Sequence, residues 1–339
     1  MADLETSWLG LKLKSPLVVA AGPISRDPAA AALAAASGAG AIVMHSLFEE
    51  QLIEEQMAAH RLIDSHADLN AEASSFMPDV NMFSLDADAY LAELSRLCQR
   101  LEIPVVASLN GTTPGGWVRY ARRLADAGAS ALELNLYDVA THPVESGADV
   151  ETRQVELVAS VVSGVPIPVT VKLTPFYASV PAFVHRLEQA GAKGVTVFNR
   201  LYEPAVDLDA LEVRRTLTAS TPAELPLRLH ALAVLSSTSR LSLACSGGVH
   251  SGEDAARAIL CGAHVVQVAS ALLEHGPARI ATLRGELLRW LDTKGYASSA
   301  EARGVLNLDR APDPTAWTRM NYIRTLEGWR NRSPWRTRP

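Results

Sequence analysis

The chain has 339 residues, of which 48% are hydrophobic and 20% charged, with a formal net charge of −6. This composition is typical of a globular protein that buries its core without a metal or disulfide staple, and the negative charge excludes a general attraction to nucleic acid or anionic membranes. No apolar run of about 18 residues predicts a membrane span. Three widely separated cysteines, with no metal spacing, and a short acidic start without a signal-peptide core predict a cytoplasmic protein.

Eight short apolar runs alternate with stretches of helical periodicity. They are nearly continuous rather than alternating, as expected of parallel strands buried on both faces. No GxGxxG follows the first run, which disfavours an open doubly wound sheet. The pattern therefore predicts an α/β protein with a (β/α)8 TIM-barrel fold. The predicted strands are Leu17–Ala20, Ala41–Met44, Val105–Leu109, Ala131–Leu136, Pro168–Leu173, Gly194–Phe198, Leu241–Cys245 and Ala263–Val268.

A repeated glycine step supports the barrel. Gly38, Gly128, Gly191 and Gly262 each stand among small residues at the end of a helical stretch and before a predicted strand. Glycine at this point can adopt the left-handed conformation that ends a helix. The recurrence indicates one β/α unit used several times.

Other segments decorate the barrel. Residues 8–13 are expected to form an N-terminal hairpin against the barrel floor. An insertion follows the second strand: residues 47–63 predict an amphipathic helix suited to a dimer interface, and residues 64–86 a long connection. We expect the barrel to span residues 1–305. Residues 306–339, rich in Arg and Trp, then form a helix and tail packed on the barrel or partly disordered; a nucleic-acid role is the disfavoured alternative.

Two turns predict a phosphate site. Ser246-Gly247-Gly248 ends the seventh predicted strand, and Ala269-Ser270 ends the eighth, directly before a helical run. Barrels often bind phosphate with these two loops, and glycine lets backbone N–H groups approach the anion. A tight turn that needs glycine for its shape alone explains the first motif but not the second.

These turns resemble the flavin-phosphate end of the class 1 dihydroorotate dehydrogenase family. The resemblance continues on successive strand ends, over roughly residues 4 to 300, and implies an FMN-binding barrel. Its further motifs are Ala20-Ala21-Gly22, Asn110, Glu133-Leu134-Asn135-Leu136, Val171-Lys172-Leu173 and Phe198-Asn199.

The resemblance implies a role for each matched position. Lys172 would stabilise negative charge that develops on the flavin, and Asn135 and Asn199 would bridge flavin and substrate. The alternatives are a merely salt-bridged lysine and strand-end capping by the asparagines. The residues expected to contact FMN are Ala20, Ala21, Gly22, His45, Ser46, Asn110, Asn135, Lys172, Asn199, Ser246, Gly247, Gly248, Ala269 and Ser270.

The sequence departs from the family on the substrate side. The family's catalytic Cys or Ser aligns with Asp138, so Asp138 is the candidate base and His142 a second one, although both fit a plain polar loop. His45 stands where the family commonly has a lysine. Arg200 follows Asn199 in place of a small hydroxyl residue and favours an anionic substrate, unless it pairs with Glu203.

The sequence thus predicts an FMN-dependent oxidoreductase acting on CH–CH bonds, with hydride transfer between flavin N5 and a small anionic substrate other than dihydroorotate. A genuine dihydroorotate dehydrogenase of pyrimidine metabolism, with Asp138 as base, is the first alternative. A flavin-free phosphate-binding lyase or isomerase using Lys172 is the second, and a decayed flavin-binding subunit the third. We expect a homodimer with no metal, nucleic-acid or membrane partner, and the electron acceptor stays open.

Overall fold

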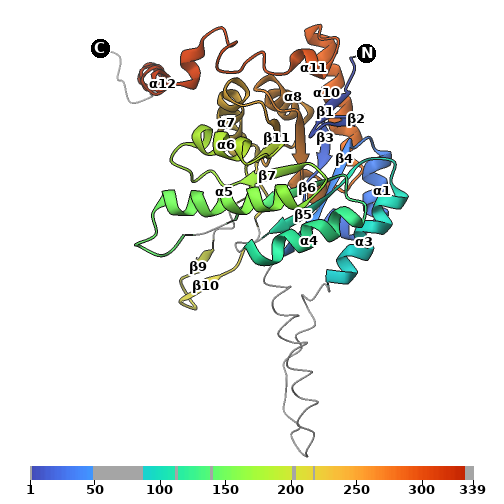
Figure 1. Ribbon diagram of the computed structural model, residues 1–339. Coiled ribbons are helices and arrows are strands. Elements are labelled where there is room, and N and C mark those ends of the chain that lie inside the picture. The colour runs from blue at the N-terminus through green and yellow to red at the C-terminus, as the bar shows by residue number, and fades with distance from the viewer. Residues whose placement is uncertain are drawn as a thin grey trace, which may run out of the picture.

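Eight parallel strands close into a barrel in the computed structural model, which describes residues 2–48, 87–110, 114–137, 140–200, 204–216 and 218–332. Their order round the ring follows the chain, and helices surround them (Figure 1). The predicted (β/α)8 fold is confirmed. The barrel strands are β3 Leu17–Val19, β4 Ala41–Phe48, β5 Val105–Asn110, β6 Ala131–Asn135, β7 Val169–Leu173, β8 Gly194–Val197, β11 Ser242–Ser246 and β12 Val265–Val268.

The ring closes between the last strand and the first. Val266 of β12 pairs with Leu17 of β3, and Val268 pairs with Val19. Beyond this seam the two ends of the barrel domain are also joined: Asp3 donates its backbone N–H to the Ala297 carbonyl (2.9 Å) and accepts from Ser299 N–H (2.8 Å). Residues nearly three hundred positions apart therefore hold the barrel shut.

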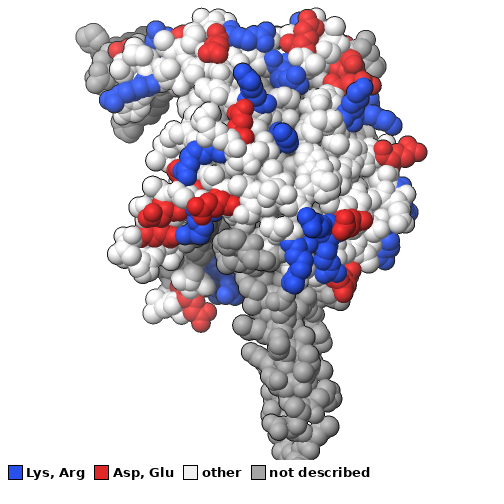
Figure 2. Space-filling view, viewed as in Figure 1, with Lys and Arg blue, Asp and Glu red and all other residues white. Residues whose placement is uncertain are grey.

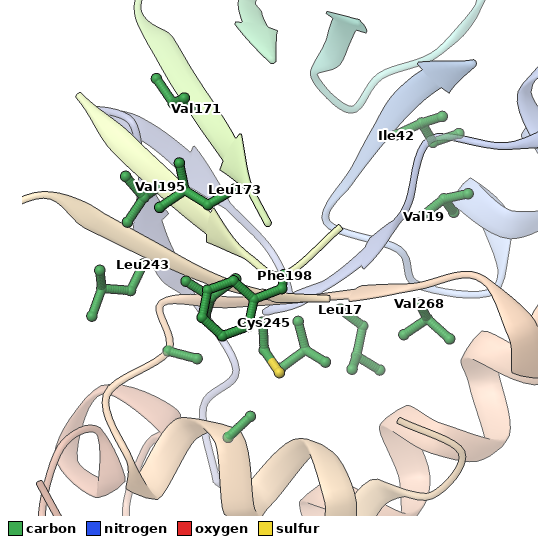
Figure 3. Packing of buried hydrophobic residues seen from close by; sticks show 14 of the residues in the cluster. Leu17, Val19, Ile42, Val171, Leu173, Val195, Phe198, Leu243, Cys245 and Val268 are labelled. Atoms are coloured by element: carbon green, nitrogen blue, oxygen red, sulfur yellow. The ribbon is translucent and has the colours of Figure 1, made fainter. Parts of the chain in front are cut away.

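Side chains alternate between an outer and an inner side along each strand, and both sides form apolar clusters except on β7 and β8, where the inner side chains are Thr170, Lys172 and Thr196. Val18 and its neighbours in the ring face the barrel interior, whereas Leu17, Val19 and their equivalents face the helices. Figure 3 shows part of this outer cluster, with side chains from several strands. Burial of both faces explains why the strand sequences are almost wholly apolar.

The predicted N-terminal hairpin is present as β1 Thr6–Trp8 and β2 Leu11–Leu13. Trp8 is fully buried and belongs to the interior cluster, and Leu9 N–H donates to Ser242 Oγ at the start of β11 (3.0 Å). The hairpin thus fills the amino-terminal end of the barrel, as predicted.

The helices begin and end where the sequence chemistry expects. Ser146 and Ser251 cap α5 and α8 in capping boxes with Asp149 and Asp254, and the four repeated glycines all have positive φ, from 93° to 119°. The helices are α1 Pro28–Ala36, α3 Ala87–Arg100, α4 Pro114–Asp126, α5 Gly147–Gly164, α6 Val180–Gln189, α7 Leu225–Thr238, α8 Gly252–Leu260, α9 Ser270–His275, α10 Arg279–Lys294, α11 Ser299–Ala302 and α12 Met320–Arg332, with 3-10 turns η1 Pro23–Arg26, η2 Pro222–Glu224 and η3 Pro314–Trp317.

The predicted helix over residues 47–63 is wrong at its start. Leu47 and Phe48 belong to β4, where Phe48 pairs with Asn110 of β5, so sheet pairing with a full-length neighbouring strand outweighs the helical pattern. The remainder of that prediction, and the connection over residues 64–86, lie outside the described residues. An exposed hairpin of β9 Ala205–Asp207 and β10 Glu212–Arg214 was not predicted.

After α11 the chain runs beside α7 and α8 before η3 and α12. Leu306 N–H donates to the Leu260 carbonyl (2.9 Å) and Leu308 N–H to the Ala233 carbonyl (3.0 Å). In Figure 1 α12 lies at the upper end of the molecule and the β9–β10 hairpin at the lower end. None of the helices within the described ranges is both long and apolar enough to cross a bilayer.

Candidate active site at the carboxyl end of the barrel

A cavity of about 330 Å³ lies at the carboxyl ends of the barrel strands, where active sites of this fold occur. The end of β7 and the segments after β3, β8, β11 and β12 contribute to its wall, together with residues 218–220 and α9. Ten of the predicted site residues line it: Ala20, Ala21, Gly22, Lys172, Asn199, Arg200, Ser246, Gly247, Ala269 and Ser270.

Lys172 reaches this cavity from β7 and is almost fully buried. Its Nζ lies 3.5 Å from Oε1 of Glu133, which is completely buried on β6. The other carboxylate oxygen, Oε2, accepts from Thr196 Oγ1 (3.1 Å) and Gln267 Nε2 (2.6 Å). Oε2 of Glu133 thereby accepts two hydrogen bonds, while the long contact between Oε1 and Lys172 leaves the ammonium N–H groups available to the cavity.

Three predicted asparagines stand in a row. Asn110 and Asn135 are paired in register at the ends of β5 and β6, and Asn199 Nδ2 donates to Asn135 Oδ1 (3.1 Å). Only Asn199 lines the cavity; Asn110 and Asn135 are buried beside it. The amide of Asn135 is therefore held by Asn199 at the cavity wall.

The glycine turn after β11 requires glycine at both positions. Gly247 and Gly248 have φ of 93° and 79°, in the left-handed region. A Cβ on Gly247 would lie 3.0 Å from Arg228 Nη2, and one on Gly248 only 2.7 Å from the backbone nitrogen of Leu225. Gly248 does not line the cavity itself, but its N–H donates to Ser220 Oγ (3.2 Å), which fixes the turn.

Ser220 links the glycine turn to the second predicted turn. Its Oγ lies 2.8 Å from Ser270 Oγ, and its N–H also donates to Ser270 Oγ (2.9 Å). His250 Nε2 lies 2.6 Å from the Ser220 carbonyl. Sequence reasoning missed Ser220, because nothing in its local pattern marks it.

Arg200, the residue after Asn199, lines the cavity, and its guanidinium group is held by Glu224. Arg200 Nη1 donates to Glu224 Oε1 (2.7 Å), and Arg228 Nη2 lies 3.4 Å from Glu224 Oε2. Burial alone would raise the pKa of Glu224, but hydrogen bonds from Arg200 and from Thr221 N–H outweigh it, so the pKa lies below its ordinary value. Two guanidinium groups thus share one ionised carboxylate, which leaves net positive charge at this wall.

The partner of Arg200 differs from the alternative that the sequence suggested. Glu203 lies outside the described residues, and the carboxylate that pairs with Arg200 is Glu224. Thr221 and Glu224 form a capping box at the start of η2, and this T-x-x-E pattern was a readable signal in the sequence.

His45 and Ser46 lie on β4 outside the cavity lining. His45 Nδ1 lies 3.4 Å from Ser25 Oγ and its ring packs edge-on against Tyr90, whereas its buried Nε2 has no partner among the described residues. Burial, and then the positive charge of Arg26, lowers the pKa of His45 to about 4. Ser46 Oγ hydrogen bonds with Ser108 Oγ (2.8 Å).

Only one of the two candidate bases lies within the described residues. Asp138 lies outside the described residues. His142 is exposed in the segment before α5 and does not line the cavity; its carbonyl accepts from Glu145 N–H (3.2 Å). Their roles stay predictions.

The fold and the site define the class: a (β/α)8-barrel protein with a cavity at its carboxyl end that suits an anionic ligand. Comparison with known proteins gives the family: a family model described as dihydroorotate dehydrogenase matches residues 3–291, so the chain belongs to the dihydroorotate dehydrogenase family. A putative dihydroorotate dehydrogenase A (fumarate) of Aeropyrum pernix is 30% identical over 310 residues, covering 89% of this chain and 97% of that protein.

Other relatives carry related names. The catalytic subunit of dihydroorotate dehydrogenase B (NAD(+)) of Pyrococcus abyssi is 28% identical over 320 residues, covering 89% of this chain and 98% of the relative. Dihydroorotate dehydrogenase A (fumarate) of Limosilactobacillus reuteri is 31% identical over 204 residues, 57% of this chain and 65% of that protein. The chain is thus a dihydroorotate dehydrogenase-like oxidoreductase.

Proposed function

We propose that the chain is an FMN-dependent oxidoreductase that exchanges a hydride between flavin N5 and a small carboxylate-bearing substrate. One observation carries the proposal: a single cavity joins the glycine turn at Gly247 to Lys172, Asn199 and Arg200. A phosphate cradle, a buried cation and a substrate-facing cation are the groups that such a reaction needs.

The residues present fit FMN. The turn of Ser246 and Gly247 and the hydroxyl of Ser270 offer donors to a phosphate, in a backbone shape that a Cβ at Gly247 or Gly248 would disturb. Beside these turns Ala20-Ala21-Gly22, which follows the neighbouring strand β3, presents only small side chains, which leave room for a flat ring system.

FMN, when bound, supplies the two-electron acceptor for the hydride. Lys172 provides a fixed positive charge where negative charge develops, and Glu133 holds that ammonium in place from the barrel interior. Asn199 orients the bound substrate, and its own amide is positioned by Asn135. We propose Asp138 as the group that exchanges the substrate proton, with His142 as second candidate.

Arg200 is proposed to select the substrate. Nη1 is engaged by Glu224, whereas Nε is buried and has no partner among the residues that the structure describes. A buried donor without an acceptor is costly, and a substrate carboxylate would satisfy it. Because Glu224 fixes the guanidinium plane, the carboxylate would be recognised in a defined orientation.

The first test is the visible spectrum of the purified protein, with chromatographic identification of the released chromophore. We expect FMN in near-equal ratio to protein. A colourless protein that takes up no added FMN would refute the proposal and favour the lyase or isomerase that uses Lys172. Arg200→Gln should keep FMN and raise KM for the carboxylate substrate by roughly tenfold or more.

A second candidate function is dihydroorotate oxidation, which the names of the relatives favour. In it the substrate loses a hydride to the flavin and a proton to the base, forming orotate. Anaerobic addition of dihydroorotate decides between the two: bleaching of the flavin with formation of orotate supports this candidate, and an unchanged flavin spectrum excludes it. We also propose that the protein is a homodimer and that it is cytoplasmic. Sedimentation of the purified protein would test the homodimer.

A further inference from the structure

A second cavity, of about 300 Å³, lies at the end of the barrel opposite the candidate active site. Strand β11 connects the two: Leu241 and Leu243 at its start line this cavity, whereas Ser246 and Gly247 at its end line the other. The remaining wall comes from the end of α7 and the residues after it, from the turn before β12 and from the chain that follows α11. In Figure 1 the last helices, α11 and α12, lie in the upper part of the molecule.

Three arginines from separate segments line this cavity: Arg240, Arg303 and Arg310. None of them forms an ion pair with a carboxylate in the part of the chain that the structure describes. Arg240 and Arg310 are exposed, but Arg303 is half-buried, and burial lowers its pKa. At the rim, Ser239 Oγ donates to Glu188 Oε2 (3.0 Å). Positive charge is therefore concentrated without a counterion, which is costly for Arg303.

Two neutral side chains add donors rather than acceptors. His264 Nδ1 accepts from Leu243 N–H (3.1 Å), so the ring proton is on Nε2 and that nitrogen can only donate. Burial, and then the charge of Arg303, lowers the pKa of His264 to about 4, which keeps the ring neutral at pH 7.

Asn307 is oriented in the same way. Its Oδ1 accepts the backbone N–H groups of Asp309 (3.2 Å) and Arg310 (2.9 Å), which leaves the Nδ2 group as a donor with no acceptor among the described residues. Asn307 is buried, so this amide is fixed by the backbone rather than free to turn. The cavity thus presents guanidinium, imidazole and amide N–H groups together.

We propose that this cavity binds a phosphorylated small molecule through its phosphate group. Arginine forks suit phosphate oxygens, an ion with two charges satisfies three cations better than a monoanion, and about 300 Å³ is at the lower end of small-molecule pockets. The site is distinct from the glycine turn at Gly247 and independent of the flavin proposal.

Inorganic pyrophosphate is the probe. It is titrated calorimetrically into the purified protein in the presence of excess FMN, so that a flavin site at the glycine turn does not compete for the probe. We expect saturable binding of one pyrophosphate per chain. Arg303→Gln should weaken it at least about tenfold, and Arg310→Gln, at an exposed position where folding is not at risk, should weaken it in the same direction. Arg289→Gln, the same charge change at an exposed position on α10, should leave it unaltered.

Absence of saturable binding, or binding that Arg303→Gln and Arg310→Gln leave intact, would overturn the proposal. Equal weakening by Arg289→Gln would also do so, because the effect would then be one of net charge. Comparing inorganic phosphate, a nucleoside monophosphate and the matching nucleoside separates the sources: tighter binding of the monophosphate indicates an organic ester, and equal affinity indicates the free ion.

Discussion

Replacement of Glu133 by Gln tests the polar centre of the barrel. The carboxylate receives Thr196 and Gln267 on one oxygen and faces the Lys172 ammonium with the other. Gln is nearly isosteric, but it has one acceptor oxygen and turns an NH2 group toward a donor. The substitution therefore leaves the buried ammonium without its counterion and one hydrogen bond without an acceptor.

The size of the effect follows from the 3.5 Å separation of Lys172 Nζ and Glu133 Oε1. At an effective dielectric constant of about 20 the two charges attract by about 5 kcal/mol. Gln avoids the desolvation cost of an ion, which offsets part of that loss. Breaking a buried pair by removing one partner typically costs about 3–5 kcal/mol. We expect the free energy of unfolding to fall by about 3–5 kcal/mol.

The assay is urea unfolding of the FMN-free protein at pH 7, followed by far-ultraviolet circular dichroism. Glu286→Gln is the matched control, because the Glu286 carboxylate accepts one backbone N–H, from Gly252 (2.7 Å), and Gln keeps an oxygen for it. The control should lose less than about 1 kcal/mol. A loss that small for Glu133→Gln, at an unchanged slope against urea, would show that the ammonium does not depend on Glu133.

Two further predictions concern pH and backbone shape. His45 has a folded pKa of about 4 against an ordinary 6.5, so between those values the unfolded chain binds a proton that the folded one refuses, and stability falls as pH drops from 6.5 to 4. The expected loss in the free energy of unfolding is about 3 kcal/mol. Urea unfolding from pH 8 to 4 should show a shallower decline of this free energy for His45→Gln than for the exposed control His185→Gln. Parallel declines of the two variants would contradict the assignment. Gly248→Ala should destabilise the chain by at least about 1–2 kcal/mol more than Gly276→Ala, because both have positive φ but only Gly248 has backbone within 2.7 Å of the new Cβ. Equal thermal shifts of the two variants would refute the steric argument.

The sequence was sufficient to predict the barrel because the strands are short, largely apolar runs that alternate with helical stretches, and four of the units end in a glycine with positive φ. The start of the insertion was wrong since Leu47 and Phe48 satisfy a helical pattern and a strand pairing equally well, and only the presence of β5 beside them decides. Mixed acidic and basic side chains on the surface drawn in Figure 2 agree with the mild net charge read from composition.

The candidate site was predictable where residues stand on strand ends, because strand order places them at one mouth of the barrel. Lys172 and Asn199 are examples. Ser220 and Glu224 could not be placed this way, since neither stands at the end of a strand: Ser220 reaches the cavity from residues 218–220, and Glu224 contacts it only through Arg200. The second cavity was still less predictable: Arg240, Arg303 and Arg310 meet only because the chain after α11 hydrogen bonds back onto α7 and α8.

The pairing of β12 with β3 has a consequence for folding during synthesis on the ribosome. β12 ends at residue 268 of 339, and the backbone bonds of Asp3 require residues 297–299. Until that late point β3 offers an unpaired edge to other chains. The ring therefore closes through contacts of very high sequence separation, which favours slow folding. Synthesis must pass residue 268 before the first strand is protected on both edges, so the nascent chain has a long interval in which an exposed strand edge favours aggregation.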